Sequence, residues 1–301
     1  MEKKLLNGKI VSEKIYSDLD YKINVLKKSN IVPRIEVILI GNRDDSELYV
    51  KMKQKKCEKL NIICSINKFK ENVSQDEIII MINKFNENKC VHGILVQLPL
   101  PSHLDTHIIL NKIHYLKDVD GFNDINIGKL TSKNNPIFYS CTACGCIEIL
   151  DFYNINISGK IITIVGCSNV VGLPLSLLLL HRNATPIICH SLTPNLINLT
   201  KQADILITAC GQTEMIKNDW IKKDCIIIDV GINRKNDPTK KKGYRTVGDV
   251  DFDDVKDKVS YITPVPGGVG PMTICILLNN IVKSAFINNN LNFSYKSDNT
   301  L

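Results

Sequence analysis

Apolar and polar residues are arranged along this chain in short blocks whose period changes repeatedly. Apolar runs at 35–40, 93–98 and 161–165 have the length of buried strands, and each is followed directly by Gly or Pro. Longer stretches between such runs carry apolar residues at helical spacing, as in 12–28. Strand and helix signals that alternate from end to end are typical of an α/β protein, so we predict that fold class.

The predicted elements form two series, which suggests two domains with a boundary near Cys141. The first series has helices at 12–28, 45–60, 74–85 and 104–113 and strands at 35–40, 62–69 and 93–98. The second has a helix at 142–152 and strands at 161–166, 186–189, 205–208, 226–230 and 259–262. Ser74 and Glu77 form a Ser-x-x-Glu capping box, which predicts a helix start. The Asn- and Ser-rich tail at 291–301 is expected to be disordered.

Composition and charge indicate a well-packed protein of 301 residues, 44% hydrophobic and 23% charged. The net charge of +7 is scattered, and the densest basic run, 240–242, lacks the interleaved aromatic residues of a nucleic-acid surface. The N-terminus has no apolar signal core, and no apolar run approaches the roughly 18 residues of a membrane span. We therefore expect a cytoplasmic protein that binds neither nucleic acid nor membrane. Its eleven cysteines are expected to be reduced, and the cluster at 141–146 lacks the second pair of a closed zinc site, so no metal is predicted.

The segment 262–273 is the most unusual stretch, with three prolines and three glycines within eight residues. Proline fixes φ and removes donors, whereas glycine lets another molecule approach the backbone. We expect a rigid loop, neither strand nor helix, that accommodates a flat ring and its polar edge. The loop should end at a helix N-terminus with Thr273 in the first turn. A stiff connector between a strand and a helix is the alternative.

A Gly-rich turn follows the first strand of the second series. The spacing Gly166-x-Ser168-x-x-x-Gly172 opens an apolar helix, so backbone N–H groups and the helix dipole could hold a phosphate. A tight turn without a ligand is the alternative, because the spacing is not Gly-x-Gly-x-x-Gly. The next strand ends at His190 and Ser191, where a Rossmann fold meets the adenosine ribose.

Two further strand ends would border the same crevice, because the carboxyl ends of parallel strands share one edge of a sheet. They carry Cys210 and Gly211, and Gly231 and Ile232. The full set of candidate cofactor residues is Thr142, Gly166, Cys167, Ser168, Val171, His190, Ser191, Cys210, Gly211, Gly231, Ile232 and Thr273.

The predicted helix at 45–60 carries a lysine on its apolar face. At about 100° per residue, one face gathers Ser46, Tyr49, Val50, Lys53, Cys57 and Leu60. Lysine is rarely buried without a partner, and in an apolar cleft it can exchange protons near neutrality. Tyr49 lies one turn earlier, where it could stack or hydrogen-bond. A lysine that reaches water from the edge of the core face is the alternative.

Two other polar features stand out in apolar surroundings. Gln97 is the one polar side chain in the strand 93–98, and a buried amide needs partners from the backbone, a ligand or Lys53. Asp118 and Asp120 belong either to a simple acidic turn or to a site where a carboxylate binds a ring carrying two N–H groups. Spacing alone leaves both choices open.

Four motifs occur here in a fixed order. They are Ser46-x-x-Tyr49-x-x-x-Lys53, the segment 92–101, the segment 117–121 and the loop 264–273. Together they resemble the bifunctional methylenetetrahydrofolate dehydrogenase/methenyltetrahydrofolate cyclohydrolase family over about Leu5 to Ala285. The resemblance implies a two-domain α/β protein with a cleft between the domains. The expected parts are a folate-side domain at 1–141, a returning helix at 271–290 that packs back on it, and a Rossmann NAD(P) domain at 142–270.

The resemblance also implies a reaction and residue roles. Hydride would pass from 5,10-methylenetetrahydrofolate to NADP, and water would then convert the methenyl product to 10-formyltetrahydrofolate in one-carbon metabolism. Lys53 would transfer protons, Tyr49 would stack on the folate, Gln97 would hold Lys53, and Asp120 would bind the pterin edge. Further folate contacts would be Val96, Leu98, Pro264, Gly268 and Val269. Tetrahydrofolate derivatives and a homodimeric partner are expected.

Two departures from the family pattern fall on the dehydrogenase side. Cys167 stands where NADP-preferring relatives commonly have Arg, and a neutral thiol cannot replace a guanidinium fork, so NAD is a possible cofactor. Compensation could come from Arg182, His190 or Ser191. Both prolines of the family's Pro-Cys-Thr-Pro are also replaced, by Ser140 and Ala143. The alternatives are a cyclohydrolase with weak or NAD-dependent dehydrogenase activity, a non-catalytic folate-binding protein, and a Rossmann dehydrogenase acting on another small acid.

Overall fold

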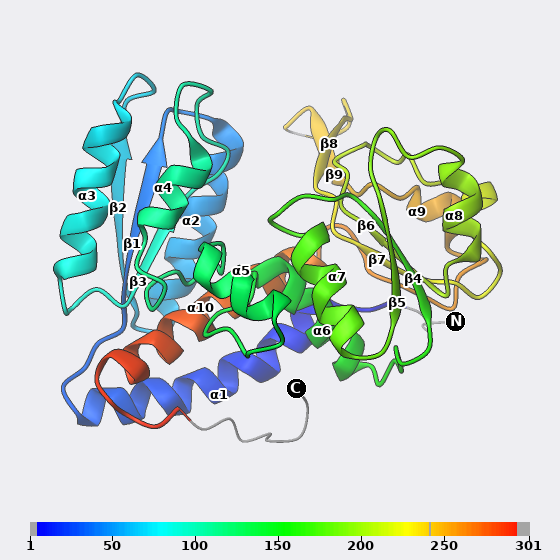
Figure 1. Ribbon diagram of the computed structural model, residues 1–301. Coiled ribbons are helices and arrows are strands. Elements are labelled where there is room, and N and C mark those ends of the chain that lie inside the picture. The colour runs from blue at the N-terminus through cyan, green and yellow to red at the C-terminus, as the bar shows by residue number, and fades with distance from the viewer. Residues whose placement is uncertain (1–4, 241, 294–301) are drawn as a thin grey trace. The chain divides into compact units, whose positions relative to one another are not determined.

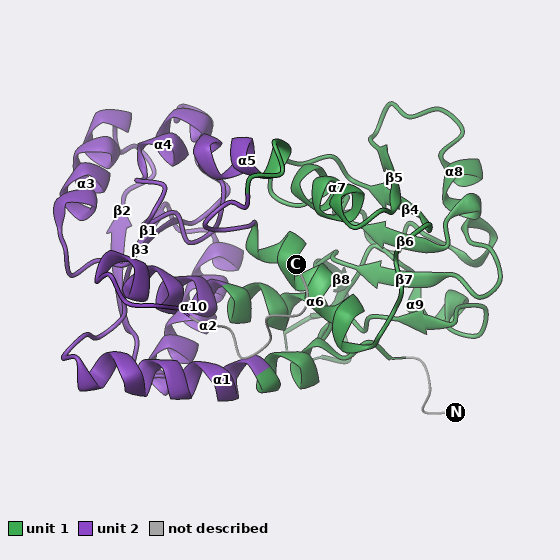
Figure 2. Ribbon diagram, turned by 60° about the horizontal axis from the view of Figure 1, so that its bottom comes forward, with its two compact units in different colours: residues 1–14, 130–134, 140–276 green, residues 15–129, 135–139, 277–301 purple. Residues whose placement is uncertain are grey.

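The computed structural model describes residues 5–240 and 242–293, so most of the tail predicted to be disordered, from 294 on, lies outside the described residues. The chain divides into two compact units (Figure 2). Unit 1 comprises residues 1–14, 130–134 and 140–276, and unit 2 comprises residues 15–129, 135–139 and 277–301. The division falls inside the first and the last helix, α1 (Gly8–Lys28) and α10 (Val269–Asn288).

Unit 2 contains a three-stranded parallel sheet in the order β2-β1-β3 (Figure 1). Its strands are β1 (Arg34–Ile40), β2 (Ile63–Phe69) and β3 (Gly93–Val96). The helices after them are α2 (Asp44–Lys59), α3 (Gln75–Glu87), α4 (Thr106–Lys112) and α5 (Asp124–Thr131). The connection through α2 runs from β1 to β2, and the connection through α3 runs in the opposite direction, from β2 past β1 to β3. Because such crossovers are right-handed, α2 and α3 lie on opposite faces of the sheet.

The hydrophobic core of unit 2 contains alternate residues of β1 and β3, because successive side chains of a strand point to opposite faces of the sheet. Ile38 and Ile94 are fully buried together with Ile78 and Ile82 of α3 and Ile109 of α4. The predicted capping box is confirmed: the Ser74 hydroxyl accepts from the backbone N–H of Glu77, and the Glu77 carboxylate accepts from the backbone N–H of Ser74.

The C-terminal half of α10 packs within unit 2. The side-chain amide of Asn280 donates to the carbonyl of Val119 at 2.8 Å, and the Ser284 hydroxyl donates to the carbonyl of Leu116 at 2.9 Å. By length and hydropathy α10 could cross a membrane, but 72% of its most apolar window is buried inside the protein. Its apolar composition is therefore that of a core helix.

Unit 1 contains a five-stranded parallel sheet in the order β10-β7-β6-β4-β5 and a separate antiparallel hairpin (Figure 1). The sheet strands are β4 (Ile161–Val165), β5 (Thr185–Cys189), β6 (Ile205–Thr208), β7 (Ile226–Asp229) and β10 (Tyr261–Ile262). The helices are α6 (Cys141–Phe152), α7 (Gly172–His181), α8 (Leu196–Gln202), the 3-10 helix η1 (Asn218–Trp220) and α9 (Phe252–Val255). The hairpin pairs β8 (Asn233–Asn236) with β9 (Tyr244–Val247). The strand order reverses at β4, which is the arrangement of a Rossmann-type fold.

Two expectations about loops and strand ends are corrected. The segment 262–273 was predicted to be neither strand nor helix, but α10 already begins at Val269, so Thr273 lies just beyond its first turn. Proline is tolerated in the first turn, where its missing N–H has no intrahelical partner, so Pro271 does not prevent the helix. The strand predicted at 93–98 ends at Val96, and Gln97 therefore follows the strand.

Candidate active site

The first part of the candidate site in unit 2 is one face of α2. Ser46, Val50, Lys53 and Cys57 are buried, as the helical spacing predicted, and Lys53 is only 7% exposed. Its Nζ lies 6.0 Å from the ring centroid of Tyr49, which is half-buried one turn earlier. Burial raises the pKa of the Tyr49 hydroxyl. The alternative in which Lys53 extends into water is therefore wrong.

The partner of Lys53 is Gln97. The Lys53 ammonium donates to Gln97 Oε1 at 3.1 Å. The Gln97 side-chain N–H donates to the carbonyl of Leu98 at 2.8 Å, and its backbone N–H donates to the carbonyl of Ile38 at 2.9 Å. Because the amide nitrogen is held by a carbonyl, the amide oxygen is the atom that faces the ammonium group. Gln97 therefore has two of the partners that the sequence left open, a backbone carbonyl and Lys53.

The segment 117–121 forms a turn beside β3, paired through Ile94 and Asp118. The buried Asp118 carboxylate accepts the backbone N–H groups of Gly121 and Asn123 at 3.1 and 2.9 Å, and also that of Phe122 at 3.1 Å. Burial raises the pKa of Asp118 to about 7. Asp118 therefore holds the turn together, and Asp120 is the half-buried acid that the turn presents.

Lys117 has a structural partner outside this turn. Its ammonium group donates to the carbonyls of Phe85, Asn86 and Asn88 at 2.9, 2.7 and 2.8 Å. These carbonyls lie at the C-terminal end of α3, where a helix leaves its last acceptors unpaired and favours a cation. Lys117 therefore stabilises the end of α3.

The candidate cofactor residues lie in unit 1, at the carboxyl ends of neighbouring parallel strands. Gly166 follows β4 with φ +130°, and a Cβ there would lie 2.3 Å from the carbonyl oxygen of Ala209. A Cβ on Gly172 would lie 1.9 Å from the carbonyl oxygen of Gly166. Only glycine fits at both positions, so the turn offers bare backbone at the start of α7. Such a turn fits the diphosphate of a dinucleotide.

The side chains around this turn carry little positive charge. Cys167 and Ser168 are exposed, and the Ser168 hydroxyl accepts from the backbone N–H of Val171 at 3.2 Å. Arg182 is held in a bidentate pair with Asp151, at 2.8 and 2.9 Å, which removes it as a compensating group for Cys167. The other two residues proposed to compensate for Cys167 are exposed at the end of β5. They are His190 and Ser191.

The remaining predicted residues are divided between the units. In unit 1, the hydroxyl oxygens of Thr142 and Thr273 lie 3.2 Å apart, and the N–H of Gly268 donates to the carbonyl of Pro264 at 2.7 Å. Val269 is buried at the start of α10. In unit 2, Val96 is the last residue of β3, and Leu98 is half-buried two positions later.

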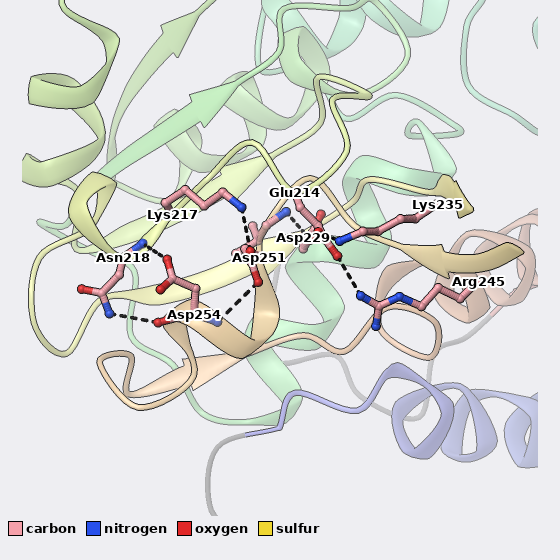
Figure 3. A network of polar contacts seen from close by, with 9 residues as sticks. Glu214, Lys217, Asn218, Asp229, Lys235, Arg245, Asp251 and Asp254 are labelled. Atoms are coloured by element: carbon pink, nitrogen blue, oxygen red, sulfur yellow. Dashed lines mark hydrogen bonds and ion pairs between the residues drawn. The ribbon is translucent and has the colours of Figure 1, made fainter. Parts of the chain in front are cut away.

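Sequence reasoning missed two buried acids of unit 1, Asp229 and Asp249, which are 4% and 0% exposed. Burial raises the pKa of Asp229 to about 6. Figure 3 shows Asp229 beside a polar network in which Glu214 pairs with Lys235 and Arg245. The available signal was the position of Asp229, an acid that directly ends an otherwise apolar strand.

These observations define an α/β protein with a Rossmann-type unit suited to a dinucleotide and a second α/β unit that carries a buried lysine–amide pair. Comparison with known proteins makes the class more specific. Residues 6–120 match the family described as "Tetrahydrofolate dehydrogenase/cyclohydrolase, catalytic domain". Residues 140–289 match "Tetrahydrofolate dehydrogenase/cyclohydrolase, NAD(P)-binding domain".

Individual relatives agree over nearly the whole chain. Bifunctional protein FolD 2 of Arabidopsis thaliana is 46% identical over 284 residues, which covers 94% of this chain and 95% of that protein. The crystal structure of the bifunctional FolD of Campylobacter jejuni is 45% identical with a TM-score of 0.90, covering 95% of this chain and 99% of that one. The FolD of Trypanosoma brucei, solved with NADP and an inhibitor, is 35% identical with a TM-score of 0.90, covering 95% and 98%.

The chain therefore belongs to the tetrahydrofolate dehydrogenase/cyclohydrolase family. It is a bifunctional enzyme of one-carbon metabolism, which oxidises 5,10-methylenetetrahydrofolate and hydrolyses the resulting 5,10-methenyltetrahydrofolate. Unit 1 carries the NAD(P)-binding fold. Of the alternatives from the sequence, the Rossmann dehydrogenase acting on another small acid and the non-catalytic folate-binding protein are thereby set aside.

Proposed function

We propose that Lys53 is the group that transfers protons in the cyclohydrolase reaction. The observation that carries this proposal is the 3.1 Å hydrogen bond from the Lys53 ammonium to Gln97 in a site where Lys53 is 7% exposed. Water attacks the methenyl carbon of the substrate and must lose a proton as the carbinolamine forms and opens to the formyl product. Lys53 receives or delivers that proton, since a positioned side chain within hydrogen-bond reach is what general acid–base catalysis requires.

The other residues of unit 2 bind and orient. Gln97 keeps the Lys53 ammonium at a fixed place, and Tyr49 stacks on the folate ring system next to it. Asp120 accepts from the N–H pair at the pterin edge, a bidentate contact that also fixes the ring plane. Val96 and Leu98 supply apolar contact beside Gln97. Predicted folate contacts in unit 1 are Pro264, Gly268 and Val269.

For the dehydrogenase reaction we propose NADP as the cofactor. When bound, its nicotinamide accepts the hydride that leaves the one-carbon unit. Gly166 and Ser168 at the start of α7 would hold the diphosphate, with Cys167 and Val171 beside it, and His190 and Ser191 would lie at the adenosine ribose. Thr142, Thr273, Cys210, Gly211, Gly231 and Ile232 would line the remainder. The NADP seen in the Trypanosoma brucei relative supports this choice, whereas the neutral Cys167 keeps NAD as the alternative.

We also propose a homodimer in the cytoplasm. β5 is an edge strand of its sheet, and Leu180 on α7 and Ile188 on β5 are 54% and 38% exposed. Exposed apolar side chains next to an unpaired strand edge are typical of a surface that a second subunit covers. The eleven cysteines are free thiols in the structure, and reduced thiols are typical of a reducing compartment.

The experiment that tests the proton-transfer role replaces Lys53 with Met, which keeps the apolar stem and removes the ammonium group. The rate of methenyltetrahydrofolate hydrolysis should fall by about 100-fold or more. Lys55→Met is the matched control, because Lys55 lies on the same helix and is exposed. Hydrolysis at the wild-type rate by a folded Lys53→Met protein would refute the assignment.

A further inference from the structure

Asp229 and Asp249 form a pair of interlocked buried carboxylates in unit 1. The Asp229 carboxylate accepts the backbone N–H groups of Gly231, Asp249 and Val250 at 2.9, 3.0 and 3.0 Å. It also accepts from the Thr208 hydroxyl at 3.1 Å. Asp229 therefore ties the last residue of β6 and the turn after β7 to the segment that follows the hairpin.

Asp249 makes the reciprocal set of contacts. One of its carboxylate oxygens accepts the backbone N–H groups of Cys210 and Gly211 at 2.8 and 3.2 Å and lies 3.4 Å from the Cys210 thiol. The other oxygen accepts from the side-chain amide of Asn233 at 2.9 Å. Asp249 thus fixes the turn after β6 against the first residue of β8.

The close approach of these carboxylates depends on two glycines. A Cβ on Gly248 would lie 1.8 Å from Asp229 Oδ2, and a Cβ on Gly231 would lie 2.4 Å from the Asp249 carboxyl group. Asp229 thus occupies the space beside Gly248, which directly precedes Asp249, and Asp249 occupies the space beside Gly231, two residues after Asp229. The donors that hold both acids are backbone and side-chain N–H groups, a hydroxyl and a thiol. Directed dipoles of this kind hold a buried carboxylate in one orientation.

We propose that Asp249, supported by Asp229, is a positioning residue for cofactor binding. This inference rests on the proposed placement of the cofactor at Cys210, Gly211, Gly231 and Ile232. Asp249 is 0% exposed, so it cannot touch the cofactor and acts through the turns that it holds. Those turns follow β6 and β7, two neighbouring parallel strands, and the Asp249 carboxylate contacts the first of them directly. The second is held by Asp229 through Gly231.

The test is Asp249→Asn in the full-length protein, with the dissociation constant of NADP⁺ and NAD⁺ measured directly and both enzymatic reactions assayed. An amide is neutral and keeps only one acceptor oxygen, so the turn after β6 and Asn233 are held more weakly than by the carboxylate. The dissociation constant and the KM for the nicotinamide cofactor should rise about tenfold or more. The cyclohydrolase rate, assayed on methenyltetrahydrofolate without nucleotide, should stay within about twofold of wild type.

Asp253→Asn is the matched control, because Asp253 has an exposed side chain only four residues away. Asn233→Ala removes one donor to Asp249 without altering either acid, and it should weaken cofactor binding in the same direction if Asp249→Asn fails to fold. Unchanged cofactor binding in a folded variant would overturn the proposal. So would an equal loss of both activities, since that is the result of general destabilisation. If the wild-type protein binds neither nucleotide, the proposed cofactor site is itself wrong, and this inference fails with it.

Discussion

The Lys53 ammonium group lies 3.1 Å from the side-chain oxygen of Gln97, although the two residues come from different elements of unit 2. Lys53 is on α2, which follows β1, and Gln97 follows β3, which pairs with β1. The order β2-β1-β3 brings both segments to the carboxyl end of the central strand. Crevices at such ends of parallel strands are the usual ligand sites of open α/β sheets.

Removing the acceptor for Lys53 should impair hydrolysis. In Gln97→Leu the ammonium loses its fixed partner, so the cyclohydrolase kcat should fall at least about tenfold, part of the 100- to 10,000-fold contribution of a positioned proton-transfer group. Steady-state assays on methenyltetrahydrofolate measure this directly. Gln202→Leu, at the exposed end of α8, should leave the rate unchanged. If kcat is retained in Gln97→Leu, the hydrogen bond has no role in the reaction.

The buried His92 should make unit 2 sensitive to acid. Burial, and secondly the charge of Lys117, lower the pKa of His92 to about 4, and its Nδ1 accepts the backbone N–H of Arg34 at 3.1 Å. Between pH 6.5 and about 4 the unfolded chain binds a proton at this histidine and the folded chain does not. The free energy of unfolding should therefore decrease as pH falls through this window, by up to about 3 kcal/mol.

Denaturant unfolding between pH 4 and 7 measures this dependence. His92→Asn, whose side-chain oxygen can still accept from Arg34, should show a shallower decrease than wild type over that range. The exposed His107→Asn provides the comparison and should follow the wild-type curve. Parallel curves for all three proteins would mean that His92 binds its proton as readily in the folded as in the unfolded chain, so that its pKa is not lowered by folding.

A guanidinium at the cofactor turn should strengthen the preference for NADP. Cys167 is exposed beside Gly166, so Cys167→Arg can reach an anionic group without repacking. An arginine–phosphate contact contributes about 1.5–3 kcal/mol, so the ratio of kcat/KM for NADP⁺ over NAD⁺ should rise roughly 10- to 100-fold. Cys90→Arg, at an exposed cysteine of unit 2, should leave that ratio unchanged. An unaltered ratio in Cys167→Arg would place the ribose phosphate elsewhere.

Lys117 should matter for stability. Lys117→Met deletes three hydrogen bonds to carbonyls at the end of α3 and leaves these acceptors in a buried setting. We expect the free energy of unfolding to decrease by about 2–4 kcal/mol. Chemical denaturation compares it with the exposed Lys112→Met, which should unfold like wild type. A loss below about 0.5 kcal/mol would show that water replaces the ammonium group at these carbonyls.

Local patterns explain why much of the fold could be predicted. The burial of one face of α2, including Lys53, follows from helical periodicity, and the start of α3 follows from a capping box of two residues three positions apart. The parallel strands β1, β3 and β4 were visible as short apolar runs followed directly by Gly or Pro. The start of α10 was placed two residues too late, at 271 and not at Val269, because the prolines and glycines of the segment before it were interpreted as a rigid loop.

Contacts between distant segments could not be predicted in the same way. Asp118 and Asp120 are equally acidic in the sequence, and only the folded turn shows that the Asp118 carboxylate is used by backbone N–H groups. Asp229 and Asp249 are separated by the hairpin β8–β9, so neither periodicity nor spacing indicates that they interlock. Such pairings depend on the order of the strands in the sheet, which local patterns in a single sequence do not reveal.

The most direct test of the account is a turnover assay resolved by cofactor. Purified protein receives 5,10-methylenetetrahydrofolate with NADP⁺ or with NAD⁺, and reduced nicotinamide and 10-formyltetrahydrofolate are followed together. We predict reduction with NADP⁺, accompanied by the formyl product. No reduction with either nucleotide, while added methenyltetrahydrofolate is still hydrolysed, would contradict the bifunctional assignment and leave a cyclohydrolase.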